Sequence, residues 1–217
     1  METLLLLPSS VHGFRQKLST TDCVLMILSA LRVAKRKKQC ISLAFCNIAK
    51  AYDSVCRELM YTKLRHIGFG GRVVALIRSM YFKDCLRVNL HHGLSDPVYF
   101  TQGVKQGCSL SPMLFALFIA SLGVVLDRTK LGVELGGMIL TALFFADDLL
   151  LLSRTPKHGM NSLLRVVSQF CKDMKMILST SKTYILTNSR NQGSWKVEED
   201  TIEEILVAKY LGVSIQV

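Results

Sequence analysis

Two adjacent aspartates, Asp147 and Asp148, interrupt an apolar run at residues 143–152. Burying one unpaired carboxylate carries a large desolvation penalty, and a second one beside it adds like-charge repulsion. A bound cation is a common way to offset both. The alternative is a solvated hairpin turn between two buried strands, because aspartate suits turns. The pair alone supports a turn and a metal site about equally.

The same run does not fit a membrane span. The apolar stretch at residues 139–152 is shorter than the roughly 20 residues that a helix needs to cross a bilayer, and it carries both charges inside it. Residues 1–8 begin with an apolar burst, but this is short, contains an acid and lacks a basic leader. We therefore expect neither a membrane partner nor secretion.

Charge narrows the choice of partners. The chain has 217 residues, of which 50% are hydrophobic, enough to bury a core in one domain or in one domain plus part of a second. Lys and Arg outnumber Asp and Glu by 27 to 16, which gives a formal net charge of +11. This balance favours a polyanionic partner, with nucleic acid first. A basic ribosomal protein or a membrane-surface protein would share it.

The cysteines are odd in number, scattered, and never spaced as C-x-x-C. Reduced, packed thiols are therefore expected, and neither a disulfide framework nor a zinc site is indicated. This is consistent with a location inside the cell, in the cytoplasm or the nucleus. The seven residues are Cys23, Cys40, Cys46, Cys56, Cys85, Cys108 and Cys171.

Hydrophobic periodicity, together with residues typical of helix starts and ends, predicts one strand and three helices in the first half of the chain. The strand at residues 41–46 is expected to end at Asn47, and the helix at 72–81 is expected to carry Val73, Leu76, Ile77 and Met80 on one apolar face. Asp53 or Ser54 is expected to cap the helix at 55–67. The predicted helices are Ser19–Val33, Val55–Ile67 and Arg72–Tyr81.

Further elements follow in the second half of the chain. Alternating residues predict a hairpin over 86–100 with its turn at His91–Gly93. Ser111 as the N-cap and Pro112 at the first helical position predict the start of a buried helix that reaches Leu126. The polar stretch 187–200 is expected to be a surface loop. The remaining elements are a strand–turn–strand over 139–152, a helix over 160–174, and strands at 183–186 and 210–215. Antiparallel hairpins with helices on one face give an α+β architecture.

Three ordered segments carry a family resemblance. They are residues 45–55 (FCNIAKAYDSV), 103–115 (GVKQGCSLSPMLF) and 145–148 (FADD). They resemble motifs of the reverse transcriptases of non-LTR (LINE-type) retrotransposons. The likeness runs from about Val11 to the C-terminus, and it implies a polymerase palm over residues 41–217, a remnant of the fingers over 1–40, an end near the primer-grip strand, and no thumb.

The resemblance implies chemistry with two Mg²⁺ ions. In the family, carboxylates of the first and third motifs hold two metal ions that activate the primer 3′ hydroxyl and neutralise the triphosphate. Asp147 and Asp148 match the third motif, and Lys182 looks like the cation that assists the leaving group. The implied partners are an RNA template, a DNA primer and a dNTP.

Other residues are assigned to the nucleotide and the template by the same resemblance. Tyr52 stands where the family has an aromatic that blocks a ribose 2′ hydroxyl, and Gln106 and Gly107 lie in the segment that approaches a base pair. Phe145 and Ala146 belong to the third motif. Arg15 looks like a phosphate-contacting cation, although a plain surface cation explains it equally well.

Asn47 departs from the family, which has a metal-binding aspartate at this position. Asparagine keeps the shape and one acceptor oxygen but lacks the charge. At an effective dielectric of about 20, one charge at contact range is worth roughly several kcal/mol, and each 1.36 kcal/mol is about tenfold in rate. A loss of about a thousandfold or more is expected, and Asp53 is not expected to replace the missing carboxylate.

Three hypotheses remain open. The first is a fragment of an RNA-directed DNA polymerase, impaired by Asn47 and by truncation. The second is a non-enzymatic basic protein that keeps the palm fold and binds nucleic acid. The third is an unfolded product of a decayed gene. Metal dependence of binding separates the first two, and cooperative melting separates both from the third.

Overall fold

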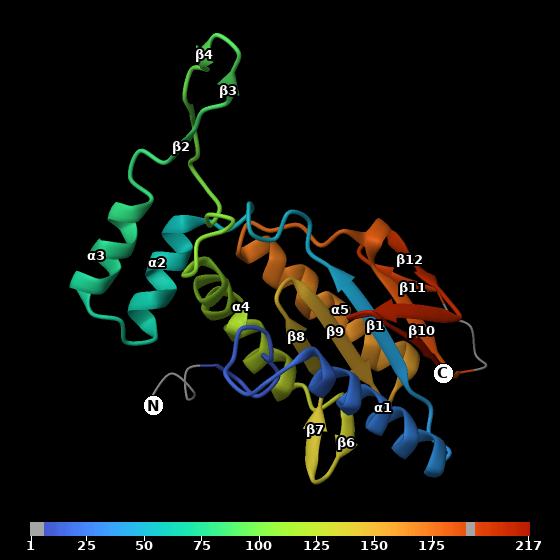
Figure 1. Ribbon diagram of the computed structural model, residues 1–217. Helices are drawn as coiled ribbons and strands as arrows, with labels where there is room; N and C mark the ends of the chain where they lie inside the picture. The colour runs from blue at the N-terminus through green and yellow to red at the C-terminus, as the bar shows by residue number, and fades with distance from the viewer. Residues whose placement is uncertain (1–6, 190–193) are drawn as a thin grey trace.

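The computed structural model describes residues 7–189 and 194–217. Its centre is a six-stranded sheet with the order β11-β12-β10-β1-β9-β8 (Figure 1). All neighbours pair antiparallel except β10 and β12, which run parallel. The strands are β1 (Ser42–Asn47), β8 (Ala142–Phe145), β9 (Asp148–Ser153), β10 (Tyr184–Thr187), β11 (Trp195–Val197) and β12 (Asp200–Glu204).

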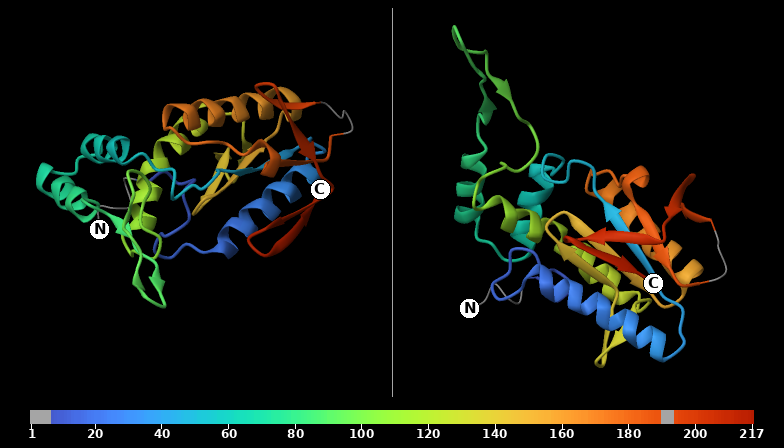
Figure 2. Two further views of the ribbon diagram at one scale, coloured as in Figure 1. Left: turned by 90° about the horizontal axis from the view of Figure 1, so that it is seen from above. Right: turned by 45° about the vertical axis from the view of Figure 1, so that its right-hand side comes forward.

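Alternation along β1 sorts its side chains onto two apolar cores. Ala44 and Cys46 join the core under α4 and α5, whereas Leu43 and Phe45 face the opposite core, which contains Ile27 of α1. Figure 2 shows α1 and α5 on opposite sides of the strands. The helices are α1 (Thr20–Arg36), α2 (Arg57–His66), α3 (Gly71–Met80), α4 (Ser111–Arg128) and α5 (Pro156–Asp173).

The predicted α+β class with an antiparallel sheet is confirmed, with one addition. Helices cover both faces of the sheet instead of one, because α1 packs on the face that α4 and α5 leave open. Residues 20–36 therefore share a core with the sheet; their assignment to a fingers remnant stays a prediction. Within the described residues α4 alone is long and apolar enough to cross a membrane, and most of it is buried in the core.

Small hairpins complete the fold. The predicted hairpin over 86–100 is confirmed, and it projects from the body beside α3 (Figure 1). The strand expected at 210–215 is two strands that pair with each other and cover α1. The short strands are β2 (Cys85–Leu86), β3 (Asn89–Leu90), β4 (Gly93–Leu94), β5 (Val98–Tyr99), β6 (Val133–Leu135), β7 (Met138–Leu140), β13 (Val207–Tyr210) and β14 (Val213–Gln216).

Two predicted helix caps are wrong. Cys56 precedes α2 as its N-cap, because residues 49–54 form consecutive turns that keep Asp53 and Ser54 away from the helix start. Leu110 is the N-cap of α4, because the amide of Ser111 already closes a turn by donating to the Cys108 carbonyl at 3.1 Å. Ser111 is thus the first helical residue.

Two further expectations need correction. In α3, Val74 and Ile77 are buried, but Val73, Leu76 and Met80 of the predicted apolar face are exposed, because this helix lies at the edge of the molecule and packs against α2. The stretch 187–200 is not one loop, because it contains β11, whose buried Trp195 donates to Glu204 at 2.8 Å. The turn residues Asn191–Gly193 lie outside the described residues.

Candidate active site

The β8–β9 hairpin presents the two aspartates at the end of the sheet. Asp148 begins β9 and pairs with Phe145 on one side and with Asn47 of β1 on the other. Ala146 and Asp147 form the turn between the strands, and Ala146 has a left-handed φ of 57°. Such a backbone costs a residue with a side chain about 1–2 kcal/mol. Strand pairing holds this tight turn in place.

Both aspartates are exposed, as the hairpin-turn alternative implied. Leu149 and the residues after it are buried, whereas the carboxylates lie just beyond the core where the strands end. The desolvation argument from the sequence therefore overstated the need for a cation. What the structure supports is a rigid hairpin that projects two carboxylates into solvent.

The segment before α1 braces this turn. His12 donates its amide to the Phe144 carbonyl at 2.8 Å, and Val11 forms a parallel bridge to the same residue. Gly13 then passes so close that a Cβ there would lie 2.4 Å from the backbone nitrogen of Ala146. Only glycine fits this approach without a shift of the hairpin.

Asn47, Asp148 and Lys182 meet in one pocket of about 150 Å³. Lys182 ends a short 3₁₀ helix at Thr180–Lys182, and this segment is pinned to β1 because Ser179 donates its amide to the Asn47 carbonyl at 2.8 Å. Tyr184, Lys209 and Tyr210 line the same pocket. Sequence reasoning did not assign Lys209 to the site.

The pocket perturbs its titratable groups. Desolvation, followed by the charge of Asp147, raises the pKa of Asp148. Burial also raises the pKa of Tyr184 and of Tyr210, and the charge of Asp148 adds to both shifts. The carboxylate form of Asp148 is therefore disfavoured, and an added cation would favour it.

Tyr52, Gln106 and Gly107 line a second groove of about 520 Å³. The Tyr52 ring stacks on Phe115 with centroids 4.8 Å apart, and Gln106 donates to the Asp53 carboxylate at 3.0 Å. Desolvation raises the pKa of Tyr52, and the charge of Asp147 raises it further, so this groove borders the aspartate turn. The structure brings these three residues together; their contacts with a nucleotide stay a prediction.

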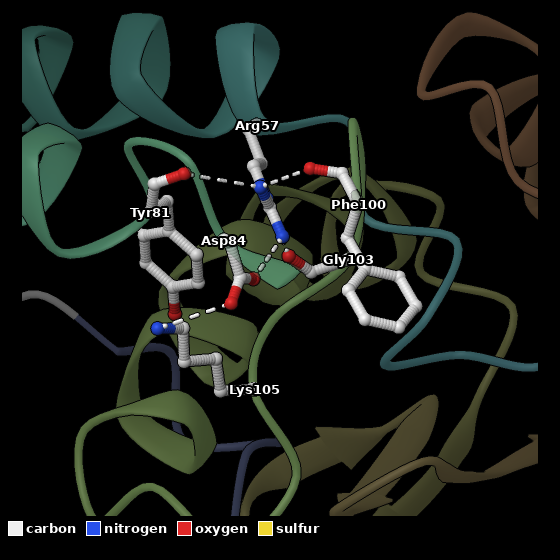
Figure 3. A network of polar contacts seen from close by, with 6 residues as sticks. All are labelled: Arg57, Tyr81, Asp84, Phe100, Gly103 and Lys105. Atoms are coloured by element: carbon white, nitrogen blue, oxygen red, sulfur yellow. Dashed lines mark hydrogen bonds and ion pairs between the residues drawn. The ribbon is translucent and has the colours of Figure 1, made fainter. Parts of the chain in front are cut away.

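A buried arginine fixes the loop that forms this groove (Figure 3). Arg57 donates to the carbonyls of Gly103 and Phe100 and to the Asp84 carboxylate, each at 2.8 Å. Its guanidinium lies 4.7 Å from the centroid of the Tyr81 ring. The network ties the start of α2 to the base of the projecting hairpin. Sequence reasoning missed it, because a single arginine after a loop carries no signal.

The network continues to the groove itself. Lys105 pairs with the other Asp84 oxygen at 3.2 Å (Figure 3). Gly103 has a φ of +85°, and a Cβ there would lie 2.9 Å from the Asp53 carbonyl oxygen. The loop is thus held from both sides before it reaches Gln106. Gly107, also at positive φ, has open space around it and exposes its backbone to the groove.

Three other site candidates have structural contacts. Arg15 donates to the carbonyls of Pro8 and Val11 at 3.2 and 3.1 Å, so its guanidinium holds its own segment. Phe145 is half-buried against the core that contains α1, and Ala146 contributes the turn backbone. The predicted contacts of these three residues with template or nucleotide stay predictions.

Asp147, Asp148 and Asn47 are the residues of this site whose side-chain oxygens could hold a divalent cation. Among the described residues no group of three or more His, Cys, Asp or Glu side chains is placed to hold a metal. Two carboxylates with an amide oxygen from Asn47 suit one Mg²⁺, which keeps several waters and takes further ligands from substrate phosphates. A second ion would lack its protein carboxylate.

Comparisons with known proteins agree with this architecture. A family model described as reverse transcriptase (RNA-dependent DNA polymerase) matches residues 1–215. The chain is 30% identical over 206 residues to the transposon TX1 uncharacterized 149 kDa protein of Xenopus laevis, and the match covers 88% of this chain and 15% of that protein.

A second relative and a solved structure extend the comparison. The Pol polyprotein of the type-2 retrotransposable element R2DM of Drosophila melanogaster is 28% identical over 173 residues, with 80% of this chain and 16% of that protein covered. Telomerase from Candida tropicalis, solved with a TWJ fragment of telomeric RNA, superposes with a TM-score of 0.68 at 13% identity, over 95% of this chain and 32% of that chain.

These matches confirm the resemblance drawn from the sequence motifs. The chain spans about a sixth of the length of the two transposon proteins. The telomerase likeness concerns the fold alone. By a family model that matches nearly its whole length and by relatives from non-LTR retrotransposons, the chain belongs to the reverse transcriptase (RNA-dependent DNA polymerase) family.

Proposed function

We propose that this chain is a nucleotidyl-transfer palm in which Asp147 and Asp148 still bind Mg²⁺ but catalysis is strongly weakened. The observation that carries the proposal is the direct pairing of Asn47 with Asp148 on neighbouring strands. An amide stands beside the aspartate turn where the family has a metal-binding carboxylate. A bound Mg²⁺ would supply charge neutralisation at a triphosphate and activation of a primer hydroxyl.

The chain's own residues take defined roles. Asp147 and Asp148 hold the cation with the Asn47 amide oxygen, and the exposed Lys182 is available to a departing pyrophosphate at the rim of the same pocket. Tyr52, rigid through its stack on Phe115, limits the space beside a sugar. Template RNA, primer DNA and a dNTP are the proposed partners, inside the cell.

Metal binding tests the proposal without requiring turnover. Mn²⁺ titration, followed by electron paramagnetic resonance, should show weak binding that Asp148→Ala abolishes and that Asn47→Asp strengthens by about tenfold or more, since one added charge at contact range is worth roughly several kcal/mol. Asn89→Asp adds the same charge on the exposed β3 and should leave the affinity unchanged. Equal affinity in wild type and Asn47→Asp would contradict the role assigned to position 47.

Extension assays complete the test. With poly(rA), oligo(dT), dTTP and Mg²⁺ or Mn²⁺, the wild-type chain should extend the primer at least about a thousandfold more slowly than an active family member, by the loss of several kcal/mol at Asn47. Robust extension would overturn the impairment. Asn47→Asp need not restore the activity if regions outside this chain are required.

A binding platform is the second candidate function. The net charge of +11 and the exposed Lys182 and Lys209 beside the aspartate pocket favour it. It predicts RNA or DNA binding whose log affinity falls steeply with log salt concentration. Nucleic-acid binding that is unchanged by Mg²⁺ and by Asp147→Ala supports the platform. Binding that strengthens with Mg²⁺ and weakens in Asp147→Ala supports the catalytic palm.

A further inference from the structure

Cys108 occupies an unusual position among the cysteines. All seven are free, and Cys23, Cys46 and Cys171 are buried in the cores, where desolvation raises their pKa values, that of Cys23 to about 11. Cys40 and Cys85 are exposed. Cys108 is half-buried and lines the open groove of about 520 Å³ that also holds Tyr52 and Gln106. Cys56 is also half-buried, and the buried Cys46 and Cys171 line smaller pockets of about 150 and 220 Å³, so Cys108 is the half-buried cysteine found in the wider groove.

The surroundings of Cys108 favour its ionised form. The pKa of the Cys108 thiol is lowered, first by the nearby Leu110 backbone amide, and the positive charge of Lys105 acts in the same direction against partial burial. This is the amino end of α4, an 18-residue helix whose first amides lack carbonyl partners inside the helix. Helix amino ends and nearby cations are known to stabilise thiolates.

Ser111 supplies an independent observation. Its side chain is 1% exposed, and within the described chain its Oγ has no hydrogen-bond partner. A buried hydroxyl left unpaired costs about 1–3 kcal/mol. Ser111 lines the same groove as Cys108. An acceptor arriving in the groove, or an ionised sulfur beside it, would satisfy this hydroxyl.

We propose that Cys108 is a nucleophilic cysteine that small, soft electrophiles modify when they enter this groove. The thiol first gives its proton to water, and the resulting thiolate attacks an electrophilic carbon such as the CH₂ of iodoacetamide. A sulfur–carbon bond forms, the carbon–iodine bond breaks, and iodide leaves with the bonding electrons. The product is a neutral thioether at the wall shared with Tyr52 and Gln106.

Competitive labelling tests the proposal on the folded chain. A short pulse of isotopically labelled iodoacetamide, followed by unfolding and a chase with the unlabelled reagent, gives the relative rate at each cysteine by peptide mass spectrometry. Cys108 should react at least severalfold faster than Cys40 and Cys85, although both of those are more exposed. A Cys108 rate at or below theirs would overturn the proposal.

A matched pair of variants tests the mechanism. Ser111→Ala removes the orphaned hydroxyl and should slow the labelling of Cys108 severalfold while leaving the rate at Cys40 unchanged. Ser109→Ala removes an exposed hydroxyl from the same groove and should change neither rate. If Ser111→Ala folds, as judged by an unchanged rate at the buried Cys46, and Cys108 still reacts at the wild-type rate, the role of Ser111 is refuted.

An alkyl group on Cys108 should obstruct the groove and weaken nucleic-acid binding. This consequence rests on the proposed function. Wild-type chain alkylated at Cys108 should bind labelled poly(rA) several times more weakly than unmodified chain, whereas Cys108→Ala treated in the same way should not change. Labelling rates do not depend on nucleic-acid binding. Fast labelling without any poly(rA) binding would therefore count against the proposed function and leave the nucleophile assigned.

Discussion

The pocket at Asp148 and the groove at Tyr52 border the same aspartate turn but are held in different ways. The pocket is built by strand register, because Asn47, Asp148 and Phe145 lie side by side on three neighbouring strands. The groove is built by a loop that a buried arginine ties to α2 and to the projecting hairpin (Figure 3). Regular backbone pairing positions the first, and side-chain hydrogen bonds position the second.

This difference predicts how each region responds to mutation. A side chain at the end of a paired strand can change without loss of the backbone that presents it. A loop that depends on one buried ion pair does not tolerate such a change, because removing one partner leaves the other charge buried and uncompensated. The groove should therefore be the fragile half of the candidate active site, and the aspartate pocket the robust half.

The largest effect is expected at Arg57. Arg57→Ala leaves Asp84 and two carbonyls without their donor, and it should lower the free energy of unfolding by about 3–5 kcal/mol. Urea denaturation followed by circular dichroism measures this loss. Arg72→Ala, on the exposed start of α3, should change stability by less than about 0.5 kcal/mol. A loss at Arg57 as small as that at Arg72 would show that the groove does not depend on the network.

The next largest loss of stability is expected at Gly13, which packs against the aspartate turn. Gly13→Ala places a Cβ 2.4 Å from the Ala146 nitrogen, so the hairpin or the brace must shift, at a cost of about 1–3 kcal/mol. Gly71→Ala is the control, since a Cβ there meets nothing within 4 Å. Thermal melting of the two variants gives the comparison. Equal melting temperatures would mean that residues 10–13 do not hold the turn.

The strands and helix around the aspartate pocket were predicted well from the sequence. Apolar runs and helical spacing report local burial, so the hairpin at 139–152 and the helix at 160–174 were found close to their observed bounds. Pattern alone did not show where the strands leave the core, and it therefore left a solvated turn and a metal site at Asp147 and Asp148 equally open. Exposure depends on how far a strand extends past its neighbours, which only the assembled sheet determines.

The loop-held region could not be predicted in the same way. The two carbonyls that Arg57 binds at 2.8 Å lie 43 and 46 residues along the chain, and no periodic pattern links residues at such distances. Gln106 was assigned to the site from its motif, but its hydrogen bond to Asp53 was not predicted. Asp53 was instead expected to cap α2, whereas in the structure it lies in the turns before that helix. The motifs identified the family, whereas the support of the groove came from contacts distant in sequence.

A smaller effect is expected at Asp148, with a defined pH dependence. Its pKa is raised in the folded chain, so between the ordinary value and the raised one the folded state binds more protons than the unfolded state, and stability falls as pH rises through this window. Asp148→Asn removes that penalty. It should stabilise the chain at neutral pH by less than about 1 kcal/mol, given the exposure of the group.

Urea titrations at several pH values measure this effect. The gain from Asp148→Asn should be complete above the raised pKa and should vanish in acid, where the wild-type carboxyl is protonated in both states. Asp96→Asn, an exposed acid on the projecting hairpin, serves as the control and should show no such trend. A gain that grows toward acid pH would have the wrong sign for a desolvated carboxylate. Saturating Mg²⁺ should reduce the gain, because a bound cation stabilises the ionised form.

The smallest effect is expected at the turn residue Ala146. Ala146→Gly removes the strain of a left-handed backbone, about 1–2 kcal/mol, but it also gives the unfolded chain more freedom, about 0.5–1 kcal/mol. The net change should be a stabilisation of no more than about 1 kcal/mol, measured by urea denaturation. Ala142→Gly, at the buried start of the same hairpin's first strand, gains no relief of strain and should destabilise instead. Equal losses at the two positions would show that Ala146 is unstrained, and the aspartate turn would then owe its shape to local preference instead of to the strands that pair on either side of it.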